Sequence, residues 1–135
     1  MESSKAFWLS LGAIEENDIY GNKDEGIGIY NGGCPVIKRN NIHDGNDSGV
    51  YVSGSKGIIT DNEIYSNDHA GIRIYFGGNP EVTFNHIKKN GFEGVWISLK
   101  SGGTFKYNDL SENQRGAWDI SEDSESLVKR SDNQE

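Results

Sequence analysis

Aromatic side chains recur in this sequence at a spacing that could build a ligand-binding surface. One or two follow each short apolar run, about once per repeat, and an arginine lies among them. Trp, Tyr and Arg dominate binding surfaces because they combine apolar area with a polar group. Aromatic rings can also stack on sugar rings or anchor a peptide. The predicted binding face contains Trp8, Tyr30, Tyr51, Arg73, Tyr75 and Trp96.

The same aromatic residues have a second interpretation, which the sequence leaves open. On a parallel sheet, rings on neighbouring strands stabilise one another by packing, without any ligand. A structural role and a binding role therefore predict the same residue types.

Ionisable side chains suggest little chemistry. A polar column follows a recurring Asn and contains Asp18, Asn41, Glu63, His86 and Asp109. Asp18 and Glu63 would lie two strands apart, roughly 10 Å, at or beyond the ~6.5–9.5 Å between the carboxylates of an inverting glycosidase. His43, His69 and His86 show neither zinc-site nor triad spacing. We predict a solvated polar edge, with no catalytic residue, no metal and no cofactor.

A repeat positions all of these residues. Its leading Asn occurs at Asn17, Asn40, Asn62, Asn85 and Asn108, with spacings of 23, 22, 23 and 23. An apolar residue lies three positions before each Asn, and a Gly or Ala nine positions after it starts an alternating apolar pair. Alternation with β-branched residues is typical of strands. Each period therefore holds three short strands and has no room for a helix of ordinary length.

Two solenoid folds have periods near this length. A leucine-rich repeat needs leucine at its core positions, but here Ile outnumbers Leu 14 to 5. We predict an all-β, right-handed, single-stranded parallel β-helix of about six rungs over residues 1–120. Equivalent positions would stack about 4.8 Å apart, so repeated Asn side chains could hydrogen-bond from rung to rung.

Two expectations concern the turns. A second Asn follows the first by five positions, at Asn22, Asn67, Asn90 and Asn113. Gly45 interrupts this series, and we expect Asn46 to replace the missing amide. The recurring glycines before the alternating strands are expected to supply a bend with positive φ; they are Gly26, Gly49, Gly71 and Gly94.

The last segment, residues 121–135, differs from the repeat. It contains five acidic and two basic residues, and its only aliphatic residues are Leu127 and Val128. The repeat is expected to stop at residue 120. We predict either a disordered tail or a C-terminal cap over the exposed strand edges.

Charge and composition exclude some partners. The chain has 13 basic and 21 acidic residues, so its net charge is 13 − 21 = −8, which excludes a protein that binds the nucleic-acid backbone. No apolar run approaches the ~20 residues of a membrane span. Cys34 is the only cysteine, and residues 1–5 lack the layout of a secretory signal. These features predict a soluble intracellular protein, cytoplasmic or nuclear.

The repeat unit also resembles known families. Its clearest copies run from Gly26 to Asn40 and from Gly71 to Asn85, with Gly-Ile-x-Ile, then a Gly-Gly turn and a Pro, then Asn. The unit resembles the repeats of F-box/β-helix receptors of cullin-type ubiquitin ligases and of Shc-binding spindle/midbody proteins. It more distantly resembles the repeat of carbohydrate-binding proteins and sugar hydrolases of the pectin-lyase type. The resemblance covers residues 6–120 and implies a β-helix that recognises a protein.

We therefore predict a non-catalytic module that binds a protein or peptide partner on the aromatic face. The alternative is a polysaccharide ligand on the same face, bound or, secondarily, cleaved by lyase or hydrolase chemistry. A third prediction is a rod that associates end to end, because solenoid ends expose strand edges.

Overall fold

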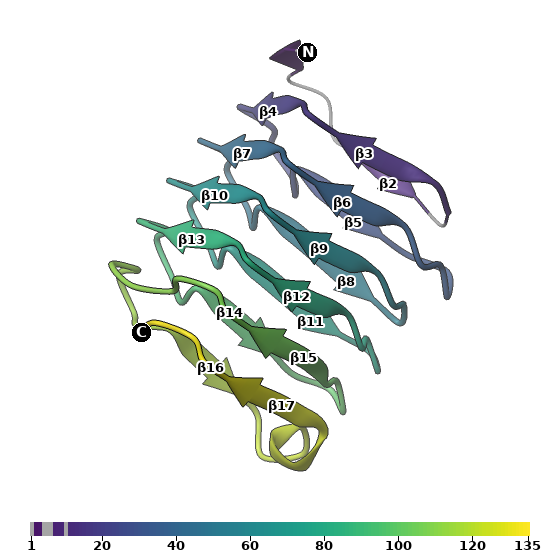
Figure 1. Cartoon of the computed structure of the whole chain (residues 1–135), viewed down its shortest axis with the longest axis vertical. Coiled ribbons are helices and arrows are strands. Elements are labelled where there is room, and N and C mark those ends of the chain that lie inside the picture. Colours follow the sequence, from purple (N-terminus) through teal and green to yellow (C-terminus); the bar gives the residue numbers. More distant parts are fainter. Residues whose placement is uncertain (1, 4–6, 10) are drawn as a thin grey trace.

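A computed structural model describes residues 2–3, 7–9 and 11–135, with the backbone alone for residues 2–3 and 7–9. Over these residues the chain forms seventeen short strands and one 3-10 turn, η1 (Glu125–Leu127). The strands stack turn upon turn into a rod with three flat faces (Figure 1).

Each face of the rod is one sheet. Sheet A contains β1 (Glu2–Ser3), β4 (Asp18–Tyr20), β7 (Asn41–His43), β10 (Glu63–Tyr65) and β13 (His86–Lys88). Sheet B contains β2 (Phe7–Leu9), β5 (Ile27–Ile29), β8 (Val50–Ser53), β11 (Ile72–Tyr75), β14 (Val95–Ile97) and β16 (Trp118–Ile120). Sheet C contains β3 (Ala13–Glu15), β6 (Val36–Lys38), β9 (Ile58–Thr60), β12 (Glu81–Thr83), β15 (Gly103–Lys106) and β17 (Val128–Ser131).

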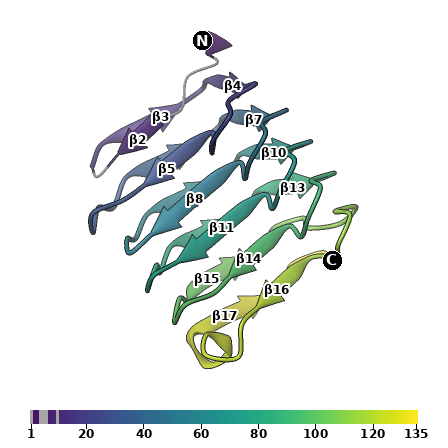
Figure 2. The same cartoon turned by 180° about the vertical axis from the view of Figure 1, so that it is seen from behind.

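The topology confirms the predicted right-handed parallel β-helix. Every strand pair is parallel, and the register advances by one repeat per turn, as in Ile42↔Ile64 and Ile64↔Ile87. Sheets B and C have six strands each over the described residues, in agreement with about six rungs, and sheet A has five. Sheet C faces the viewer in Figure 1, and sheet B faces the viewer in Figure 2.

A column of aliphatic side chains fills the space between the three sheets. Sheet B contributes two inward residues per strand, such as Ile72 and Ile74 in β11, and sheets A and C contribute one each, such as Ile64 and Ile59. All four side chains are fully buried. Because the core is one thin column, a low apolar content suffices to build it.

The predicted asparagine ladder lies at the corner between sheets C and A. Asn40 shows its full hydrogen bonding: its Oδ1 accepts from the backbone N–H of Asn17 at 3.0 Å, and its Nδ2 donates to Asn62 Oδ1 at 3.1 Å and to Ile14 O at 3.0 Å. The same bonds recur along the rod, so the amides satisfy buried groups that the corner would otherwise leave unpaired. The ladder comprises Asn17, Asn40, Asn62, Asn85, Asn108 and Asn133.

The residue before each ladder asparagine is left-handed. The six φ angles lie between 55° and 58°, at Glu16, Arg39, Asp61, Phe84, Tyr107 and Asp132. This conformation is uncommon outside glycine, and the amide bonds of the next residue hold it in place. We call these six positions the corner column.

The prediction for the recurring glycines is wrong in its reason. Gly26, Gly49, Gly71 and Gly94 are not among the residues with positive φ. They are small because the chain is crowded there: a Cβ on Gly49 would lie 2.6 Å from Ile64 Cγ2 and 2.9 Å from the carbonyl oxygen of Gly71. Contacts below 3.0 Å would force the backbone of the next rung away.

A second ladder runs along the corner between sheets A and B, and it is interrupted. Asn67 Nδ2 donates to Asn90 Oδ1 at 3.1 Å, but Gly45 offers Asn22 no amide. The Nδ2 of Asn22 is therefore buried without a hydrogen-bond partner among the described residues. Asn46 does not replace the amide as we predicted; it is exposed, and its N–H donates to Asn22 O at 2.8 Å.

The solenoid register continues beyond residue 120, where the sequence analysis placed the end of the repeat. β17 pairs with β15, and Asn108 N–H donates to Asn133 Oδ1 at 3.0 Å. The indole N–H of Trp118 donates to Glu135 Oε2 at 2.8 Å. Residues 128–135 thus add a further layer to the rod, and the division of the chain into a solenoid and a tail stays a prediction.

The interrupted ladder predicts a stabilising substitution. Gly45→Asn should give Asn22 Nδ2 an acceptor, because position 45 has the same register as Asn67 and Asn90. Satisfying one buried donor is worth about 1–3 kcal/mol. Gly45→Ala is the control, because it shares the loss of unfolded-state entropy but carries no amide. Chemical denaturation should show Gly45→Asn to be more stable than Gly45→Ala by about 1 kcal/mol or more; equal stability would contradict this account.

Candidate functional site

The predicted binding face lies on the outside of sheet B. Tyr51, Arg73 and Trp96 are register partners on β8, β11 and β14. Tyr30 and Tyr75 lie in the neighbouring column, so the aromatic residues form a zigzag over four consecutive turns. Five predicted residues are thus brought together, and each is half-buried. We call Tyr30, Tyr51, Arg73, Tyr75 and Trp96 the aromatic face; the side chain of Trp8 lies outside the described residues.

The rings of the aromatic face meet edge to face. Centroid distances are 5.6 Å for Tyr30–Tyr51, 5.9 Å for Tyr51–Tyr75 and 5.5 Å for Tyr75–Trp96. The interplanar angles are 78°, 82° and 84°. Each contact is a favoured aromatic geometry, so the rings hold one another in fixed orientations.

Arg73 is fixed within the aromatic face. Its guanidinium carbon lies 4.3 Å from the ring centroid of Tyr51 and 5.4 Å from that of Tyr75. Its Nη1 lies 3.8 Å from Asp47 Oδ1, and His69 Nδ1 contacts the same oxygen at 2.9 Å. The Nε of Arg73 is buried without a hydrogen-bond partner. The cation thus supports the rings from within the sheet surface.

Tyr30 is anchored at one end of the aromatic face. Its hydroxyl donates to Glu25 Oε1 at 3.0 Å, and Glu25 is buried. Burial first, and then the hydrogen bond to this carboxylate, raise the pKa of the Tyr30 hydroxyl well above its usual range. Tyr30 is therefore a neutral donor to Glu25 at any ordinary pH.

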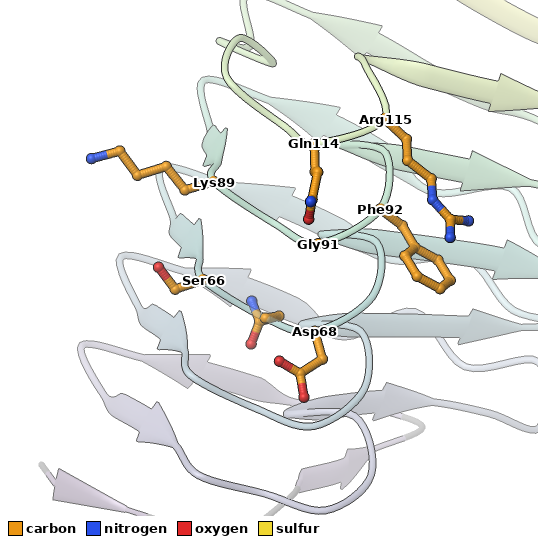
Figure 3. Close-up of a pocket in the computed structure, with 8 residues that line it drawn as sticks. Ser66, Asp68, Lys89, Gly91, Phe92, Gln114 and Arg115 are labelled. Carbon is orange, nitrogen blue, oxygen red and sulfur yellow. The ribbon is translucent and has the colours of Figure 1, made fainter.

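The other end of the aromatic face continues into a hollow at the corner between sheets A and B. Phe92 links the two, with its ring 6.2 Å from Trp96 and stacked on His69 at 4.6 Å. Arg115 lies over the Phe92 ring at 3.7 Å (Figure 3). The hollow has a volume of about 560 Å³. It is lined by Ser66, Asn67, Asp68, Lys89, Gly91, Phe92, Gln114 and Arg115.

The lining of this hollow suits a ligand rich in hydroxyl groups. Ser66, Asp68 and Gln114 supply hydrogen-bonding groups beside an aromatic ring, the combination that orients small ligands. Neither Lys89 nor Arg115 forms an ion pair with a described residue. Two cations without carboxylate partners thus border the hollow, and they could bind an acidic group.

The sequence analysis did not predict this hollow. Its residues lie in the turns between strands, and their side chains show no periodicity. The one available signal was Phe92, an aromatic residue close to Trp96 in the sequence, and turn geometry is needed to bring Arg115 onto it.

His43 is the centre of a second cluster, on the outside of sheet A. Its Nε2 lies 2.7 Å from Asp18 Oδ1 and its Nδ1 lies 2.5 Å from Asp44 Oδ2. The rings of Tyr20 and Tyr65 stack on it at 5.5 and 4.7 Å. The signal was available in the sequence, because position three after the leading Asn carries Tyr20, His43 and Tyr65 on successive turns.

The polar column of sheet A forms separate pairs rather than one catalytic site. Asp18 is held by His43, while Glu63 contacts His86 Nδ1 at 3.0 Å. Asp18 and Glu63 both pair in register with Asn41, so they are two strands apart, as predicted. Within the described part of the chain, no group of three or more His, Cys, Asp or Glu side chains could hold a metal ion.

Comparison with known proteins identifies the family. The chain belongs to the right-handed β-helix family, whose sequence pattern matches residues 4–133. The crystal structure of a mutant of the periplasmic alginate epimerase AlgG is similar, with a TM-score of 0.86 and 16% sequence identity over 96% of this chain. The chain spans 35% of the length of that enzyme. No curated protein gives a significant sequence match.

These comparisons correct two sequence-based expectations. The family match supports a β-helix in general, and neither comparison supports the F-box or Shc-binding resemblance. The predicted intracellular location is contradicted by the similarity to an enzyme described as periplasmic. A lone cysteine and five N-terminal residues were weak grounds for assigning a compartment. Among the described residues, no helix has the length and apolarity to cross a membrane.

The His43 cluster predicts a pH-dependent stability. Partial burial lowers the pKa of His43, but hydrogen bonds to Asp44 and Asp18 outweigh it, and the net effect raises this pKa above its usual value. A raised folded-state pKa stabilises the fold fully below the unfolded pKa of about 6.5, and the effect is lost as pH rises through the folded pKa.

NMR titration should therefore give a pKa of His43 above 6.5, and Asp18→Asn should lower it. His43→Gln should remove the corresponding fall in unfolding free energy with rising pH. A His43 pKa at or below about 6.5 would contradict the arrangement.

Proposed function

We propose that this β-helix binds a polysaccharide along the aromatic face of sheet B, with an acidic sugar unit at the hollow beside Phe92. The observation that carries the proposal is the continuous line of aromatic residues from Tyr30 to Trp96, which ends at Phe92 and a hydroxyl-binding hollow. The similar fold of an alginate epimerase supports a polysaccharide over the protein partner that we first predicted.

The shape of the aromatic face suits an extended polymer. Four consecutive turns, about 4.8 Å apart, give a line of roughly 15 Å across the strands. The rings are held by one another and by Arg73, so little side-chain entropy is lost when a ligand binds. A rigid flat surface with fixed rings favours the faces of successive sugar rings over a compact ligand.

Charge favours an acidic unit at only one end. The net charge of −8 repels a polyanion at long range. Lys89 and Arg115 oppose this locally, because neither is neutralised by a described carboxylate. Binding of an acidic polysaccharide should therefore depend on these two cations. We propose binding only, because Asp18 and Glu63 are each held by a different histidine.

Trp96→Ala should weaken the binding of alginate oligosaccharides. Trp96 connects Tyr75 to Phe92, so its loss removes stacking area and opens the line of rings. We expect the affinity in isothermal titration calorimetry to fall about tenfold, or ~1.4 kcal/mol. Leu11→Ala is the control, because Leu11 is exposed at the opposite end of the rod. Equal affinities of Trp96→Ala and the unsubstituted protein would exclude the aromatic face.

Arg115→Gln should weaken alginate binding severalfold and reduce its dependence on salt. The unsubstituted protein should lose affinity as ionic strength rises, because salt screens exposed charges over about 10 Å at 0.1 M. Titrations at low and high salt measure both effects. Alginate binding that is independent of salt and of Arg115 would contradict the acidic unit at the hollow, while leaving the role of Trp96 to its own test.

A further inference from the structure

The corner column carries two aromatic residues that the fold does not require. Four of its six residues are charged, whereas the fourth and fifth positions are Phe84 and Tyr107. Their φ angles are 57° and 58°. A bulky residue is a conformational outlier in this region, and such strained positions concentrate at functional sites.

These two rings face solvent rather than the core. Phe84 is 55% exposed and Tyr107 is 53% exposed. Their centroids are 5.1 Å apart, and the ring planes differ by 15°, so the rings are stacked and nearly coplanar in orientation. This parallel geometry contrasts with the edge-to-face packing of the aromatic face. The pair thus offers a flat apolar surface on a corner of the rod remote from sheet B.

A hollow of about 340 Å³ lies beside the pair. Polar groups surround it: Asp61 occupies the preceding corner position, and Glu63 and His86 project from β10 and β13. Glu63 Oε2 lies 3.0 Å from His86 Nδ1. The hollow is lined by Asp61, Asn62, Glu63, Phe84, His86 and Tyr107.

We infer that this corner is a second binding site, which takes a sugar ring that carries no carboxylate. Successive corner positions lie one strand spacing apart, about 4.8 Å. Phe84 and Tyr107 fill two of them with rings, and Asp61 fills the preceding one with a short side chain. A sugar ring above Asp61 would continue the stack, and its hydroxyls could donate to the carboxylates of Asp61 and Glu63.

The charges of the two sites differ, and this separates their ligands. Asp61 and Glu63 place two carboxylates at the corner hollow, which repel a sugar acid and favour a neutral or amino sugar. Lys89 and Arg115 give the hollow beside Phe92 the opposite preference. The corner site does not depend on the proposed function of sheet B, because it shares no lining residue with that hollow.

The test is an NMR titration of the full chain with a panel of neutral and amino tetrasaccharides, including cellotetraose and chitosan tetrasaccharide, and with an alginate tetrasaccharide. We expect the ring signals of His86 and Tyr107 to shift with at least one neutral or amino member. Alginate should shift them at least tenfold more weakly. No shift with any neutral or amino member at millimolar concentration would overturn the inference.

Phe84→Asn is the test variant, because Asn tolerates the left-handed conformation and should preserve the fold. It should weaken binding at the corner at least tenfold, and Tyr107→Asn should do the same. Phe76→Asn is the matched control: Phe76 is also left-handed, with φ 56°, and 60% exposed, but it lies outside the hollow. Equal losses in Phe76→Asn and Phe84→Asn would overturn the site, as would unchanged binding in both Phe84→Asn and Tyr107→Asn. A surface that instead binds a second copy of the chain would show concentration-dependent shifts without sugar, which also overturns it.

Discussion

The stacked asparagine amides between sheets C and A constrain every other part of this solenoid. A turn of only two residues joins the sheets there, and it buries polar backbone groups that water cannot reach. Each amide accepts from the rung before it and donates to the rung after it, as Asn40 does with Asn17 and Asn62. This geometry sets one chain conformation for the corner, including the left-handed residue before each Asn.

Because the ladder and the aliphatic column fix the register, the surface of the rod is a set of columns. A side chain in one column has neighbours at the same position one turn earlier and one turn later. Tyr20, His43 and Tyr65 stack for this reason, and so do Phe84 and Tyr107. Function on this fold therefore depends on which side chains fill a few adjacent positions. The similarity to a larger alginate epimerase shows the scaffold and leaves those positions to be interpreted from their own chemistry.

The sequence predicted the solenoid well because its signals are periodic. The leading Asn, the alternating apolar pairs and the small residues before sheet B all recur at 22–23 residues. Asn133 was missed because it follows Asn108 by 25 residues, a spacing lengthened by η1. The glycine prediction was wrong because a small residue relieves either strain or crowding, and only the distance to Ile64 distinguishes the two at Gly49. The outward position of Tyr51 and Trp96 followed from alternation, but the hollow around Phe92 depends on turn geometry that has no period.

A polysaccharide array is the most direct test of the central claim, that the aromatic face of sheet B binds a polysaccharide. The unsubstituted protein and Trp96→Ala would be compared on immobilised acidic and neutral polysaccharides, alginate included. The account predicts selective binding by the unsubstituted protein that Trp96→Ala loses. An array on which the folded protein binds nothing, or binds equally well without Trp96, would contradict it and return a protein partner as the first hypothesis for this face.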